Sequence, residues 1–132
     1  MSPVIKQYAA TAGRLIFALW YFGVGVVGFA LNDQAKDIAH AATAFEAALA
    51  QTGFMNPLLC LGCFLGGGAL LFRRTAPLGI ALLAPLVVII FCFHLFITKS
   101  YLWGTLNLLW LAVLAWRYRR GFDQLWHYTG PV

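Results

Sequence analysis

Residues 77–98, PLGIALLAPLVVIIFCFHLFIT, contain no Asp, Glu, Lys or Arg. At about 1.5 Å of rise per residue, a helix of this length covers the roughly 30 Å hydrocarbon core of a bilayer. A buried helix of a soluble protein this small would show a polar face. The stretch therefore predicts a membrane-spanning helix, in which Pro85 produces a kink and the imidazole of His94 must find a hydrogen-bond partner.

Three further apolar runs flank this stretch, at residues 14–32, 55–72 and 101–117. Each just meets the length that a transmembrane helix needs. The segment at residues 33–54 is rich in alanine and carries scattered charges, so it predicts an amphipathic helix at the membrane interface rather than a span. We therefore expect one membrane domain over residues 1–132. Its fold class is all-α integral membrane, a four-transmembrane-helix bundle with an amphipathic segment between helices 1 and 2.

Clustered glycines indicate where the helices approach one another. Gly23, Gly25 and Gly28 lie close together in the first run, and Gly66–Gly68 lie inside the second. In lipid, small residues let neighbouring helix backbones come into contact. These glycines predict packing faces, within the chain or against a larger membrane partner; the alternative is that they are merely tolerated in a span.

The composition fits a membrane protein, with 62% hydrophobic and 10% charged residues. The formal net charge of +5 arises from basic residues beside apolar runs, which indicates topology signals and contacts with lipid headgroups, not nucleic-acid binding. Only Lys36 and Lys99 fall on one side of the predicted bundle. The other side holds seven basic residues: Lys6, Arg14, Arg73, Arg74, Arg117, Arg119 and Arg120. The positive-inside rule places these seven, and both termini, in the cytoplasm.

Polar side chains gather in the outer half of the predicted spans. Converging polar groups in a membrane are costly unless they pair or line a cavity, so we predict a ligand-binding pocket there. Its candidate residues are Asn32, Asn56, Cys60, Cys63, Cys92, His94 and Asn107.

The cysteines of this set leave several alternatives open. Cys60 and Cys63 lie three residues apart and share a helix face, so they are a candidate redox pair for exchange with a quinone or a periplasmic partner. Cysteine also packs as an ordinary small apolar residue. The spacing between this pair and Cys92 with His94 matches no compact metal site, so we expect no metal. His94 is a hydrogen-bonded core residue or a proton carrier.

The chain resembles the DoxX-like family of small four-span membrane proteins over about residues 14–122. The resemblance depends on a series of short motifs: Arg14, Phe45, Thr52-Gly53-Phe54, Pro57, Leu65-Gly66-Gly67, Ala69-Leu70-Leu71, Ala84-Pro85 and Phe93-His94-Leu95-Phe96. Two positions depart from the family pattern, with Cys63 in place of a usual glutamate and Ile89 in place of a frequent asparagine. The resemblance implies a four-helix membrane bundle and, as in some members, a subunit of a thiosulfate:quinone oxidoreductase or of an oxidative-stress complex.

These observations predict an inner-membrane subunit that supports quinone-linked or thiol-linked electron transfer and binds a quinone or lipid-like ligand. If the chain is part of an enzyme, that enzyme is an oxidoreductase. The alternative is a non-enzymatic assembly or chaperone-like subunit of a larger membrane complex or homo-oligomer. A small-molecule carrier is a third possibility, which the absence of Asp and Glu from the predicted spans disfavours.

Overall fold

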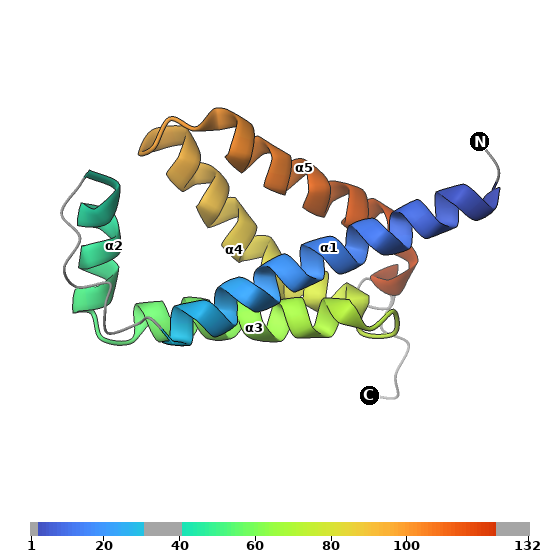
Figure 1. Ribbon diagram of the computed structural model, residues 1–132, viewed down its shortest axis with the longest axis horizontal. Coiled ribbons are helices and arrows are strands. Elements are labelled where there is room, and N and C mark those ends of the chain that lie inside the picture. The colour runs from blue at the N-terminus through green and yellow to red at the C-terminus, as the bar shows by residue number, and fades with distance from the viewer. Residues whose placement is uncertain (1–2, 31–40, 124–132) are drawn as a thin grey trace, which may run out of the picture.

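The computed structural model describes residues 3–30 and 41–123, except for the side chains of residues 3, 6 and 41–43. Regular structure within these ranges is entirely helical (Figure 1). The elements are α1 (Pro3–Ala30), α2 (Ala41–Gln51), α3 (Met55–Leu71), α4 (Ala76–Phe96), α5 (Tyr101–Arg117) and a 3-10 turn, η2 (Arg119–Gly121). The predicted all-α fold class is confirmed.

Each predicted apolar run forms a helix. Helices α3, α4 and α5 begin and end within two residues of the predicted bounds, and α4 continues through Pro85. Helix α1 differs, because it begins at Pro3 and not at residue 14. Residues 3–13 contain alanines and other residues that favour a helix, and proline is well accommodated at a helix start, so the polar segment extends the apolar helix.

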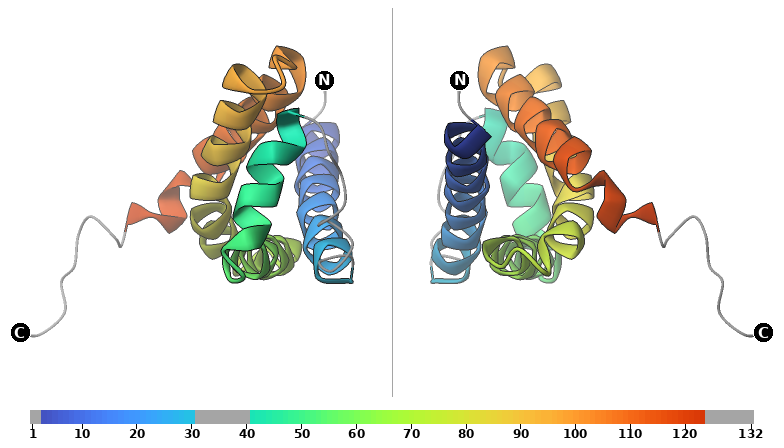
Figure 2. Two further views of the ribbon diagram at one scale, coloured as in Figure 1. Left: turned by 90° about the vertical axis from the view of Figure 1, so that its left-hand side faces the viewer. Right: turned by 90° about the vertical axis from the view of Figure 1, so that its right-hand side faces the viewer.

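The helices pack in sequence order: α1 lies along α3, α3 along α4, and α4 along α5. Viewed end-on, α3 lies between α1 on one side and α4 with α5 on the other (Figure 2). One end of the bundle gathers the start of α1, the turn between α3 and α4, and the end of α5 (Figure 1). We call it the basic end, because it carries Arg14, Arg73, Arg74, Arg117, Arg119 and Arg120.

Glycines form the closest backbone contacts between these helices. A Cβ atom added to Gly25 of α1 would lie 2.6 Å from the backbone nitrogen of Phe64 in α3. A Cβ atom on Gly79 of α4 would lie 2.7 Å from the carbonyl oxygen of Gly66. Nothing lies within 4 Å of the corresponding position at Gly23. The predicted close packing is therefore confirmed at Gly25 and Gly66 and does not extend to Gly23.

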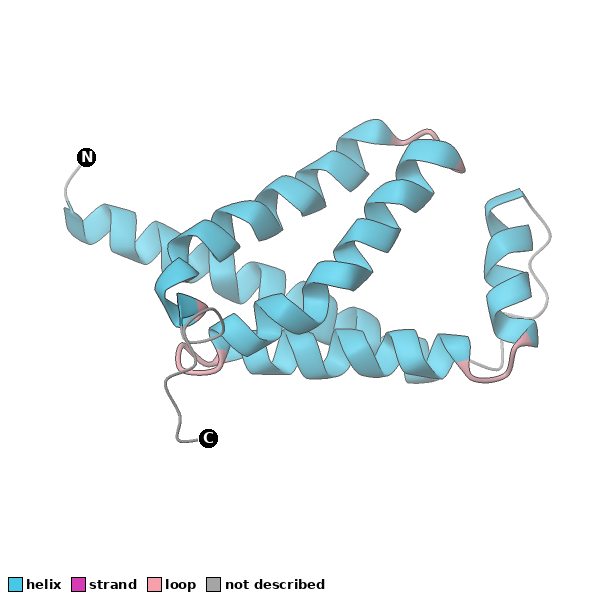
Figure 3. Ribbon diagram, turned by 180° about the vertical axis from the view of Figure 1, so that it is seen from behind, coloured by secondary structure: helices cyan, strands magenta, loops and turns pink. Residues whose placement is uncertain are grey.

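Two helical segments are long and apolar enough to cross a membrane, Gln7–Ala30 in α1 and Ala76–Phe96 in α4. A third crossing results if α2 and α3, which meet at 98°, are one broken span. Figure 3 shows this near-perpendicular arrangement. The described chain thus has two to three candidate spans, and a four-span bundle stays a prediction.

Helix α2 confirms the helical part of the prediction for residues 33–54, of which 33–40 lie outside the described residues. Its Phe45 ring lies 5.6 Å from the ring of Phe93 in α4. This contact joins α2 to the end of α4 opposite the basic end.

The core is apolar, but so is much of the outer surface. Tyr21, Leu70, Leu83 and Val87 are fully buried. Large apolar side chains are exposed along every long helix, with Leu102 at 89%. A soluble monomer rarely exposes so much contiguous apolar surface, whereas a lipid-facing surface is expected to. The structure is therefore consistent with a multi-pass membrane protein.

Candidate functional site

The predicted redox pair lies on the side of α3 that faces α1. The sulfur of Cys60 would lie 2.5 Å from a Cβ atom on Gly28, and Cys63 is 6% exposed within the hydrophobic core. Cys60, Cys63 and Cys92 are all free thiols, and Cys92 is exposed on α4. The structure therefore brings Cys60 and Cys63 into one interface and leaves Cys92 on another helix.

His94 lies in the interface between α4 and α5. Its Nδ1 is 2.8 Å from the carbonyl oxygen of Ile90, and because a carbonyl only accepts, Nδ1 donates this hydrogen bond. The predicted need for a partner is thus met within the helix. A Cβ atom on Gly104 of α5 would lie 2.9 Å from the His94 Cβ. Within residues 3–30 and 41–123, no group of three or more His, Cys, Asp or Glu side chains is arranged to hold a metal ion.

The three predicted asparagines have different surroundings. Asn32 lies outside the described residues, and Asn56 is half-buried in the first turn of α3. Asn107 is 6% exposed, and its Oδ1 accepts a hydrogen bond of 3.1 Å from the Tyr21 hydroxyl. Its Nδ2 donates to the carbonyl oxygen of Trp103 at 2.9 Å. Asn107 is therefore a buried polar link between α5 and α1.

Asn107 also lines a cavity of about 140 Å³ between α1 and α5. We call this cavity the tryptophan pocket. Its other lining residues are Ile16, Phe17, Trp20, Trp103, Leu106 and Trp110. The rings of Trp20 and Trp103 meet edge-on, with centroids 5.5 Å apart, and those of Phe17 and Trp110 lie 5.6 Å apart. Aromatic side chains from two helices thus form most of the wall.

The wall of the tryptophan pocket is almost entirely apolar, and the Asn107 amide is its polar group. The indole nitrogen of Trp110 lies beside Gly13 of α1, 3.7 Å from the position of a Cβ atom there, and Gly13 does not line the pocket. Asn107 uses one of its two amide hydrogens, on the Trp103 carbonyl, and keeps the second. The volume is below that of a drug-sized ligand site, so the pocket has room for a single ring. It suits a planar molecule that carries carbonyl oxygens.

Of the predicted site residues, Asn107 and Cys63 are brought close to one side chain, Tyr21. Tyr21 donates to Asn107 and belongs to the same buried cluster as Cys63. His94 lies in a different helix interface, so the structure does not gather the predicted set around one point. The single outer-half pocket formed by all of these residues stays a prediction.

Sequence reasoning missed the tryptophan pocket, although a signal for it exists. Trp103 and Trp110 are seven residues apart, and Phe17 and Trp20 are three apart. Both spacings place the rings on one face of a helix. Two aromatic faces in separate spans indicate an aromatic contact between those spans, which pairs the first predicted span with the last.

The three thiols should differ strongly in reactivity. With N-ethylmaleimide in mild detergent, we expect Cys92 to react first and the buried Cys63 at least about tenfold more slowly, because its reaction requires local opening of the helix contacts. Mass spectrometry of peptides at successive times measures the order. The variant Cys92→Ser should lose the fast phase alone. Equal rates at Cys63 and Cys92 would contradict the packing described for α1 and α3.

Comparison with known proteins adds no assignment. No family model, no curated protein and no solved structure matches the chain. The resemblance to the DoxX-like family stays a prediction that depends on the short motifs quoted above. The function is therefore argued from the tryptophan pocket and its surroundings.

Proposed function

We propose that the chain is a four-span subunit of a bacterial inner-membrane oxidoreductase, with both termini in the cytoplasm, and that it holds a quinone ring in the tryptophan pocket. A single observation carries the proposal: aromatic rings and the Asn107 amide, which keeps one N–H free of a partner, line a cavity between α1 and α5. The chain supplies binding and orientation, and a partner subunit supplies the electrons. The DoxX-like resemblance points to the same class of activity.

The pocket chemistry matches the ligand at two points. A quinone ring is flat, and Trp110 and Phe17 offer ring faces that stack on such a surface. A quinone carbonyl oxygen accepts a hydrogen bond, which the remaining amide N–H of Asn107 donates. A protein of this kind positions the cofactor and tunes its electronics, while the redox chemistry belongs to the cofactor.

The contact between α1 and α5 suits a ligand with a long apolar tail. Backbone contacts at glycines join α1 to α3 and α3 to α4, whereas α1 meets α5 through aromatic side chains. Side chains change rotamer more easily than backbones separate. An isoprenoid tail therefore leaves the tryptophan pocket between α1 and α5 and enters the surrounding lipid.

The electron and proton stoichiometry of quinone reduction matches that of oxidation of the Cys60 and Cys63 thiols. Reduction of a quinone to a quinol takes two electrons and two protons, and oxidation of two thiols to one disulfide releases the same number of each. Cys60 and Cys63 are both reduced and share the α3 face toward α1. That this pair, in place of a partner subunit, donates the electrons stays a prediction.

Photoaffinity labelling tests the quinone site. The protein in lipid nanodiscs is illuminated with an azido-quinone, and labelled peptides are mapped by mass spectrometry. We expect labels on α1 near Trp20 and on α5 near Trp110, removed by excess unreactive quinone. Trp110→Leu should reduce this labelling at least about tenfold, because it removes a ring face on which the quinone stacks and opens the wall of the pocket. Trp116→Leu is the matched control, since Trp116 is 72% exposed on the same helix.

The labelling pattern also separates the proposal from the pocket that the sequence predicts. Competed labels on α4 around Cys92 and His94 would contradict the tryptophan pocket and favour the predicted outer-half site. Labels scattered over exposed residues such as Leu102, insensitive to competition, would show only dissolved quinone in lipid and would overturn the proposal.

The assembly role has weaker support. Of the glycines predicted to form packing faces, Gly25, Gly66 and Gly67 have their close contacts within the chain itself. Gly23 has an open position but no further feature that indicates a partner. In the described residues, these glycines therefore pack helices of the same chain against one another.

A further inference from the structure

A second cavity, of about 570 Å³, opens at the basic end and uses none of the residues of the tryptophan pocket. Four arginines line it, Arg14 from α1, Arg73 from the turn between α3 and α4, and Arg117 and Arg120 from the end of α5 and from η2. Gln7, Thr11, Tyr118 and Gly121 complete the lining. We call it the arginine cavity. It brings together four positive charges from the first, middle and last parts of the sequence.

No carboxylate balances these charges within the described residues. None of the lining residues is acidic, and no ion pair joins the four arginines to Asp or Glu in residues 3–30 and 41–123. Like charges that converge on one cavity repel one another and raise the local concentration of anions. The arrangement becomes favourable when an anion occupies the cavity.

Arg14 is the most deeply placed of the four, with 6% of its surface exposed. Its Nη1 donates to the carbonyl oxygens of Leu70 and Leu71, at 2.6 and 2.5 Å, at the end of α3. Its Nε is buried and has no hydrogen-bond partner. The two carbonyls and the negative end of the α3 dipole compensate only part of the charge. A buried, incompletely paired guanidinium therefore lines the cavity.

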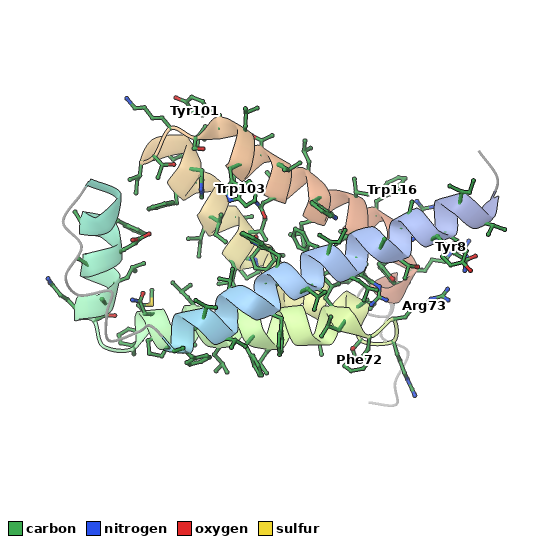
Figure 4. The ribbon with its side chains drawn as sticks, in the orientation of Figure 1. Tyr8, Phe72, Arg73, Tyr101, Trp103 and Trp116 are labelled. Atoms are coloured by element: carbon green, nitrogen blue, oxygen red, sulfur yellow. The ribbon has the colours of Figure 1, made fainter. Side chains whose placement is uncertain are left out.

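The surroundings of the arginine cavity indicate the depth at which it lies in a membrane. Tyr8, Phe72 and Trp116 are 73%, 69% and 72% exposed, and Figure 4 shows them with Arg73 at the basic end. Aromatic side chains of this kind gather at the level of lipid headgroups. The candidate spans of α1 and α4 both start at this end. The cavity thus lies where phospholipid phosphates lie.

We propose that the arginine cavity binds the phosphate of an anionic phospholipid headgroup. Guanidinium groups recognise phosphate oxygens through paired, charge-assisted hydrogen bonds, which lysines match less well. Tyr118 and Gln7 add polar groups to the lining. The volume falls in the range of small-molecule sites, so it accepts a glycerol phosphate headgroup and not only a bare ion. The exposed apolar surface beside the cavity accommodates the acyl chains.

Native mass spectrometry of delipidated protein in detergent tests the proposal. Phosphatidylglycerol and phosphatidylcholine with identical acyl chains are titrated separately, and we expect at least about tenfold tighter binding of the anionic lipid. The double variant Arg117→Gln/Arg120→Gln should lose this preference. Arg74→Gln/Arg119→Gln is the matched control, because it removes the same charge from the same end but outside the cavity, and it should stay within about threefold of the parent.

Three outcomes would overturn the proposal. If the parent protein binds phosphatidylglycerol and phosphatidylcholine equally tightly, it has no preference for the anionic headgroup. Equal losses in the two double variants show a diffuse charge effect and not a site. Binding of soluble glycerol phosphate as tight as that of phosphatidylglycerol assigns the cavity to a soluble anion. If the double variant does not fold, the neighbouring single variants Arg120→Gln and Arg119→Gln make the same comparison.

Discussion

Replacement of Gly67 by alanine should destabilise the bundle by about 3 kcal/mol, at the upper end of the usual effect of overpacking. A Cβ atom there would meet the backbone nitrogen of Phe22 and lie 2.9 Å from the Ala18 carbonyl oxygen. These are backbone atoms of α1, so no rotamer change relieves the clash and the helices must separate. Equilibrium unfolding by SDS titration in mixed micelles measures the loss.

The adjacent position provides the control. A Cβ atom on Gly68 has its nearest neighbour, an aromatic carbon of Phe22, at 3.7 Å, which is an ordinary contact. Gly68→Ala should therefore leave stability unchanged or raise it slightly, because alanine favours a helix over glycine. A similar effect of the two substitutions would contradict the described approach of α1 to α3.

Substitution of Arg14 by methionine should cost about 2 to 3 kcal/mol of unfolding free energy. The change keeps an apolar stem but removes the donor to Leu70 and Leu71, whose carbonyls at the end of α3 are left without a partner. The same SDS titration measures it. Arg14→Lys should recover part of the loss, because an ammonium group retains the charge beside the end of α3.

Arg74 gives the comparison for this effect. Arg74 lies at the same end of the bundle but is exposed, so Arg74→Met should change stability by less than about 0.5 kcal/mol. If Arg14→Met were as stable as the parent, the guanidinium would contribute nothing net, and partial burial of its charge would offset both hydrogen bonds.

The helices could be predicted from sequence because hydrophobicity is local. Helix α4 follows from a single uncharged run, and its observed bounds, Ala76–Phe96, differ little from the predicted 77–98. The start of α1 could not be placed, since a helix does not end where its side chains become polar. The number of crossings is equally hard to predict, because α3 and α5 have 17 residues each, the lower limit for a span.

The polar contacts of the two sites could not be predicted from local sequence patterns. Tyr21 and Asn107 are 86 positions apart, and only the packing of α1 beside α5 brings them into hydrogen-bond range. The alternation of the predicted spans placed the arginines at one end, whereas their convergence on one cavity depends on the tertiary packing that brings Arg14 to the end of α3. The sequence prediction grouped Cys60 with His94 only because both lie at a similar depth in the predicted spans. The structure places these two residues in different helix interfaces.

The uneven packing of the helices determines where the bundle can open. Close backbone contacts join α1, α3 and α4 at Gly25, Gly67 and Gly79, so these helices have little freedom to separate. Gly104 lets α5 approach α4 closely. Where α1 meets α5, the described contacts are made by side chains: aromatic rings, Ile16, Leu106, and the hydrogen bond between Tyr21 and Asn107. We therefore expect α1 and α5 to separate more easily than the other helix pairs, and a molecule dissolved in the bilayer to enter the interior from the side, between these two helices.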